Sequence, residues 1–128
     1  MYLDDNWAVE YTLCEIKNMY YMWVIRGVKK FIVNDHMGAL HDFTEAYHHK
    51  PYDLKVLYNL ATTYFVLGNP TKAKEYLEAA RKNIYDEAED VVKPAFDNIE
   101  TLINQVLEAQ SKGETQVKID LSKIMVVK

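Results

Sequence analysis

Apolar residues recur along most of this chain at intervals of three and four, which is the spacing of one face of an α-helix. The pattern is clearest in two consecutive stretches, 20–53 and 54–87, and in each it predicts two helices around a central turn. The turn signals are Asn34-Asp35-His36 in the first stretch and Gly68-Asn69-Pro70 in the second. Pro51 is predicted to end the second helix, because the residue before a proline is disfavoured in the helical conformation.

The two stretches repeat one pattern at an offset of 34 residues. Large apolar residues and small residues fall on their own kind: Trp23 on Leu57, Gly27 on Ala61, Phe31 on Phe65, Ala39 on Ala73, Phe43 on Leu77 and Ala46 on Ala80. The period and the order of large and small positions resemble the tetratricopeptide repeat. The first copy departs from that pattern at Lys30, where an aromatic residue is expected, and the second has Tyr85 in place of the final proline.

The flanking segments extend this array at both ends. Residues 5–17 read as one helix, the second of a repeat whose first helix is absent, and residues 88–112 read as a helix that caps the last repeat. Beyond Gly113 the pattern changes to period two, which predicts a strand or an extended tail at 115–128. The sequence therefore predicts an all-α fold. It would be a right-handed α-α superhelix of about six helices over residues 1–114, followed by the tail.

Composition narrows the possible partners. The chain has 128 residues, 49% of them hydrophobic, and a formal net charge of −4. This charge argues against nucleic acid, which needs a basic face to meet its phosphates. The most apolar stretch, 19–33, contains Arg26, Lys29 and Lys30, so we expect no membrane insertion and favour a cytoplasmic location.

Candidate chemistry is sparse. His41, Glu45 and His48 share one helix face at a spacing that could bind zinc. The resemblance to tetratricopeptide repeats implies, however, that these positions face solvent, and no second cluster completes a tetrahedral site. We therefore expect no metal, no cofactor and no enzymatic activity.

The same resemblance implies a binding surface, because the first helices of successive repeats line a concave groove in this family. The residues expected to face that groove are Tyr21, Val24, Val28, Phe31, Ile32, Lys55, Tyr58, Thr62, Phe65 and Val66. Such a surface favours a protein or peptide partner that contributes a buried apolar anchor. We expect Tyr58→Ala or Phe65→Ala to weaken binding with little effect on the melting temperature.

Two alternatives remain open from the sequence. The groove helix at 19–33 is apolar nearly all round, which is typical of a helix buried on both sides. The C-terminal tail or a second copy of the chain, in a homo-oligomer, would then cover the groove. The chain could also be a structural or self-associating segment of a larger protein, since its opening residues are loosely similar to repeat tails on bacterial membrane glycosyltransferases.

Overall fold

The computed structural model describes residues 5–82, 86–113 and 124–127, and their side chains from residue 19 onward except at 86–93. It contains five helices: α1 (Asp5–Ile32), α2 (His36–His49), α3 (Leu54–Val66), α4 (Pro70–Lys82) and α5 (Asp86–Ser111). The described residues contain no strand. The predicted all-α fold is confirmed.

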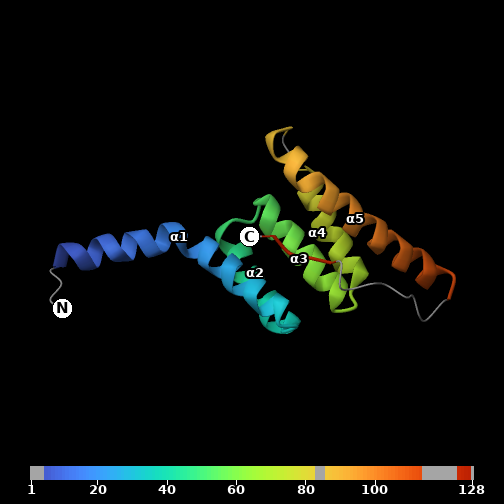
Figure 1. The fold of residues 1–128 in the computed structure, drawn as a ribbon, viewed down its shortest axis with the longest axis horizontal. Helices are drawn as coiled ribbons and strands as arrows, with labels where there is room; N and C mark the ends of the chain where they lie inside the picture. Colours follow the sequence, from blue (N-terminus) through green and yellow to red (C-terminus); the bar gives the residue numbers. More distant parts are fainter. Residues whose placement is uncertain (1–4, 83–85, 114–123, 128) are drawn as a thin grey trace.

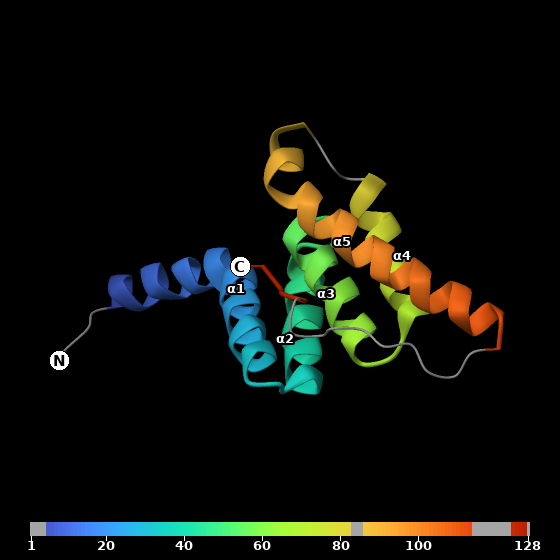
Figure 2. The ribbon, with the colours of Figure 1, turned by 45° about the vertical axis from the view of Figure 1, so that its right-hand side comes forward.

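Consecutive helices pack against one another along the chain, as in a helical repeat array (Figures 1 and 2). Each helix contacts the next, and α5 also contacts α3. Helix α2 thus packs against both α1 and α3, and helix α4 packs against both α3 and α5. The N-terminal part of α1 projects beyond the other helices in both views.

One element differs from expectation. We expected a separate helix at 5–17 followed by the first helix of the repeat, whereas the structure has the single helix α1. No glycine or proline stands between Asp5 and Arg26 to interrupt the hydrogen-bond ladder. Among the described residues there are therefore five helices, whereas about six were expected for the chain. The helix expected at 88–112 overlaps α5, which begins two residues earlier, at Asp86, and ends one residue earlier, at Ser111.

The two turns have the same construction at equivalent positions, 34 residues apart. Asn34 and Gly68 each have a positive φ, of 66° and 86°, which ends the preceding helix in the left-handed conformation. The next residue caps the following helix: the side chain of Asp35 accepts a hydrogen bond from Gly38 N at 3.0 Å, and that of Asn69 accepts one from Lys72 N at 3.1 Å. The expected turns at these two places are therefore present.

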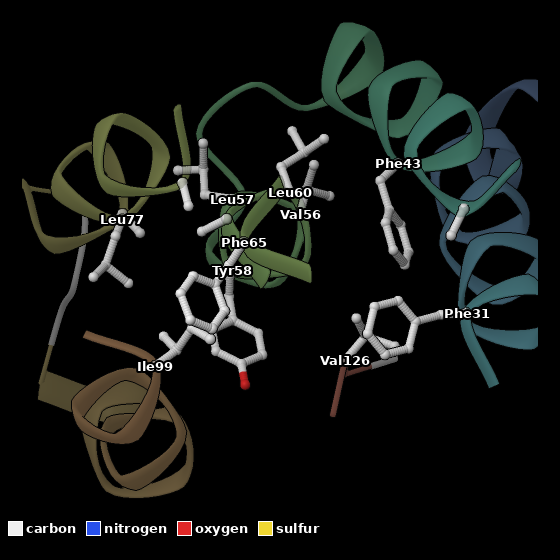
Figure 3. Packing of buried hydrophobic residues seen from close by; sticks show 14 of the residues in the cluster. Phe31, Phe43, Val56, Leu57, Tyr58, Leu60, Phe65, Leu77, Ile99 and Val126 are labelled. Atoms are coloured by element: carbon white, nitrogen blue, oxygen red, sulfur yellow. The ribbon is translucent and has the colours of Figure 1, made fainter. Parts of the chain in front are cut away.

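The repeat pattern also sets the packing of the core (Figure 3). The small residues that the offset aligns are completely buried: Ala39, Ala46, Ala61, Ala73 and Ala80. Gly27 permits the closest approach, because a Cβ atom built there would lie 2.5 Å from the ring of Phe43. Leu77 occupies the place of Phe43 in the second repeat and is also buried.

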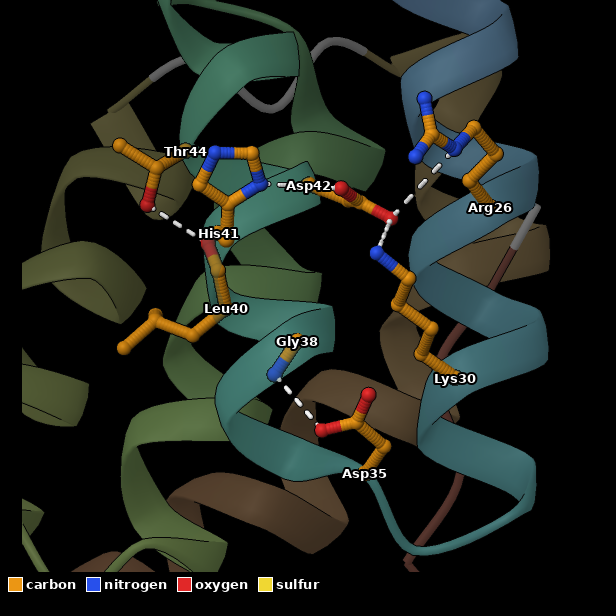
Figure 4. A network of polar contacts seen from close by, with 8 residues as sticks. All are labelled: Arg26, Lys30, Asp35, Gly38, Leu40, His41, Asp42 and Thr44. Atoms are coloured by element: carbon orange, nitrogen blue, oxygen red, sulfur yellow. Dashed lines mark hydrogen bonds and ion pairs between the residues drawn. The ribbon is translucent and has the colours of Figure 1, made fainter.

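The departure at Lys30 has a structural explanation. Its ammonium group lies 3.0 Å from the carboxylate of Asp42, which is completely buried, and Arg26 lies 3.9 Å from the same oxygen (Figure 4). The positions 34 residues later hold Tyr64 and Tyr76, whose rings stack at 5.5 Å with an interplanar angle of 9°. One repeat therefore joins its two helices by an ion pair at the place where the other uses an aromatic stack.

Candidate functional site

Residues 124–127, here called the tail, lie against α1 and α3 although they follow α5 in the sequence (Figures 1 and 2). Ile124 is 3% exposed and Val126 7%, and both belong to the hydrophobic core. Met125 between them is 55% exposed. The side chains thus alternate between the protein and solvent, as they do in an extended segment. Figure 3 shows Val126 beside Phe31 of α1.

The backbone of the tail is bound by side chains of α3. Asn59 donates from Nδ2 to the carbonyl of Val127 at 2.6 Å and accepts from the amide of the same residue at 2.8 Å. The hydroxyl of Tyr58 donates to the carbonyl of Met125 at 2.8 Å. These hydrogen bonds are made to backbone atoms of the tail, so they do not depend on the identity of its side chains. We call Phe31, Tyr58, Asn59 and Val66 the tail site.

Helix α3 holds these two polar side chains in a dry setting. Asp53 caps the helix by accepting a hydrogen bond from Val56 N at 3.1 Å, and Asn59 is completely buried. The ring of Tyr58 packs on Phe96 of α5, with 5.2 Å between centroids. Burial raises the pKa of the Tyr58 phenol, and the neighbouring Thr62 hydroxyl lowers it by less. The phenol therefore keeps its proton and acts as a donor at neutral pH.

The attachment of the tail is a balance of opposing terms of similar size. Burying an aliphatic side chain contributes about 1.5–3 kcal/mol, and a hydrogen bond contributes about 0.5–1.5 kcal/mol. Ordering the backbone costs about 1–2 kcal/mol for each residue. Two buried side chains and three hydrogen bonds therefore offset the ordering of the four tail residues to within a few kcal/mol. The docked tail is held by a small net free energy.

The residues predicted to face the groove divide into two groups. The structure buries six of them: Val24, Val28, Phe31, Tyr58, Thr62 and Phe65. Tyr21, Ile32 and Lys55 are exposed, and Val66 is half-buried. Of this set, Phe31, Ile32 and Val66 line a cavity of about 290 Å³ together with Ile124 and Met125.

This burial changes how Tyr58 and Phe65 can be tested. Their side chains are 4% and 6% exposed, so truncating either to alanine would remove core packing as well as groove surface. An unchanged melting temperature is no longer the expected result for these two variants. Removing only the phenol oxygen, by Tyr58→Phe, separates the two effects.

The residues that we expected to face the groove did not include Asn59. A signal for it was present, because Asn59 is the lone amide in the apolar segment Leu57-Tyr58-Asn59-Leu60-Ala61. A buried amide needs hydrogen-bond partners. Its partners lie 68 residues away in the sequence, and no local pattern reveals them.

The candidate metal ligands are not brought together. His41 is exposed and lies 3.1 Å from Asp42, and His48 is exposed. No group of three or more histidine, cysteine or acidic side chains suitable for a metal ion occurs in the part of the chain that the structure describes. Among the same residues, no helix is long and apolar enough to cross a membrane.

A family model described as tetratricopeptide repeat matches residues 33–94. The matched region runs from the turn after α1 into α5. Comparisons with curated proteins and with solved structures gave no match. Tetratricopeptide repeat domains are typically non-catalytic and generally serve protein–protein interaction. The paired helices, the 34-residue period and this match together show that residues 33–94 form a tetratricopeptide repeat region.

Proposed function

We propose that this chain is a protein–peptide interaction module that binds an extended partner segment in the groove between α1 and α3. One observation supports the proposal: an extended segment, the tail, lies against α1 and α3 and is hydrogen-bonded to α3. Its anchors are apolar and its hydrogen bonds are made through its backbone, so a segment of another protein with similar anchors fits the same site. The repeat domain at 1–114 would be the receptor, and residues 115–128, which include the tail, would be a separate segment.

The physical basis of binding is preorganisation. Asn59 is held on a capped helix and presents a donor and an acceptor together, which matches the amide and carbonyl of one extended residue. Phe31 and the residues around it provide apolar surface for anchors. The water-excluded setting strengthens these hydrogen bonds, because water does not compete for the same groups.

The test uses the full chain with its own anchors removed, Ile124→Ser/Val126→Ser, and a fluorescent peptide of residues 122–128. Saturable binding is expected by fluorescence anisotropy. In this background Tyr58→Phe removes one hydrogen bond and should weaken binding about 2–10-fold. Asn59→Ala removes two and should weaken it about tenfold or more.

The matched control is Asn104→Ala, which removes an exposed amide from α5 and should leave peptide binding unchanged. Circular dichroism melting of each variant shows whether a loss of binding reflects unfolding. The proposal fails if folded protein does not bind the peptide saturably, or if Asn59→Ala and Asn104→Ala have the same effect on binding.

A further inference from the structure

We propose that the tail is an internal competitor for the groove, so a partner segment binds only when residues 124–127 have left it. This inference rests on the proposed function and adds a regulatory step to it. The partner is then an extended segment with apolar side chains at two alternate positions. The chain's own Ile124 and Val126 stand in for these anchors.

The way in which the tail is held makes it separable from the helices. The hydrogen bonds that the structure describes for residues 124–127 go to the side chains of Tyr58 and Asn59, and these three bonds belong to no helix ladder. A departing tail therefore leaves the backbone hydrogen bonds of α1 and α3 intact. Each α3 side chain that loses the tail is ready to bind the same groups of another backbone.

The exposure pattern defines what the groove accepts. Ile124 and Val126 are buried, whereas Met125 between them is more than half exposed. The groove thus selects apolar side chains at alternate positions, and the residue between them contributes less buried surface. An open groove would also expose Phe31, which is 7% exposed beneath the tail. Exposed aromatic surface of this kind favours rapid refilling, by the tail or by a partner.

Competition between the tethered tail and a free peptide should weaken peptide binding by a measurable factor. A tethered segment acts at an effective concentration on the order of millimolar. A peptide of micromolar affinity must compete with this tethered tail. The apparent dissociation constant of the peptide is then its intrinsic value divided by the fraction of molecules whose groove is open. We therefore expect wild-type protein to bind the peptide of residues 122–128 at least about tenfold more weakly than the anchor-less chain.

The experiment compares three full-length proteins by anisotropy with that labelled peptide. These are the wild type, Ile124→Ser/Val126→Ser, and the control Met37→Ser, which replaces an exposed apolar side chain of α2 outside the tail. Tight binding is expected only for the double variant. Met37→Ser should resemble the wild type, since the tail and its contacts are unchanged.

A second measurement needs no variant. In ¹⁵N-labelled wild-type protein, the Val127 amide is hydrogen-bonded to Asn59 Oδ1 and should have a distinct NMR shift. Excess unlabelled peptide should move this signal towards its random-coil position, because the tail is displaced. An unmoved Val127 signal in protein saturated with peptide would overturn the inference.

The outcomes separate this inference from the proposed function. If the wild type and the double variant bind equally well, the internal competitor is overturned and the binding module stands. If neither binds, both proposals are overturned. A stable wild-type dimer in light scattering that dissociates in the double variant would also overturn the competitor, because the tail would then join two copies of the chain.

Discussion

Gly27 and Phe43 show how closely the two helices of the first repeat are fitted. The space for a Cβ atom at Gly27 is taken by the Phe43 ring, whereas the second repeat has Ala61 and Leu77 at the equivalent positions. A larger residue on one helix is thus matched by a smaller one on the other. The pair differs between the repeats while its combined size changes little.

Gly27→Ala should destabilise the fold. Overpacking of a core costs about 1–3 kcal/mol, and alanine recovers up to about 1 kcal/mol through its higher helix propensity. Urea unfolding should show a net loss of about 1–2 kcal/mol from these opposing effects. The double variant Gly27→Ala/Phe43→Leu, which copies the second repeat, should be more stable than Gly27→Ala alone. Strictly additive effects would show that the two residues do not compete for space.

At the scale of the element, the contact between α1 and α2 depends on a carboxylate with no exposed surface. Lys30, Arg26 and His41 approach Asp42, and the equivalent contact between α3 and α4 is the stack of Tyr64 on Tyr76. A buried charge is costly when its partner is removed. Replacing only one member of the ion pair should therefore destabilise the protein more than replacing both members together.

Lys30→Tyr alone should destabilise the protein, because it leaves Asp42 buried with weaker compensation. The expected loss is about 1–3 kcal/mol, below the ~3–5 kcal/mol of a fully buried pair, since Lys30 is partly solvated and Arg26 remains. Lys30→Tyr/Asp42→Tyr should recover much of it by rebuilding the stack. A double-mutant cycle in urea measures the coupling. Lys29→Tyr, at an exposed neighbouring position, is the control and should have little effect.

At the scale of the whole molecule, α5 packs against both α4 and α3. Its buried residues Phe96, Ile99 and Ile103 belong to the common core, and Arg81 of α4 binds Asp97 and Glu100 at the rim. Terminal elements of a helical array cover the last apolar face. The exposed ion pairs add little, so the apolar contacts carry the attachment.

Phe96→Ala should therefore be the more damaging of two truncations on α5. It removes a completely buried ring that also supports Tyr58, and the expected cost is about 3–5 kcal/mol. Leu102→Ala, at a half-buried position, should cost clearly less. Thermal and urea unfolding compare the two. Equal losses would mean that α5 does not depend on this central contact.

The sequence by itself determined the repeat, because its information is local. Helical spacing, the turn residues and the 34-residue alternation of large and small side chains specify two helix pairs and their order. Asn34 and Gly68 illustrate this, since each ends its helix in a conformation that its residue type favours. The same reasoning wrongly divided α1 into two helices. A helix continues where no glycine or proline interrupts it, and none lies between Asp5 and Arg26.

Only the tertiary structure decided what occupies the groove. Period two at the C-terminus predicted an extended segment, and the apolar helix at 19–33 predicted burial. The sequence left two possible covers for that helix, the C-terminal tail or a second copy of the chain, and neither pattern chose between them. The junction depends on the side-chain amide of Asn59, which pairs with the backbone N–H and C=O of Val127, groups that every residue except proline possesses. Backbone groups carry no sequence signature, so their partners appear only when the folded chain brings distant segments together.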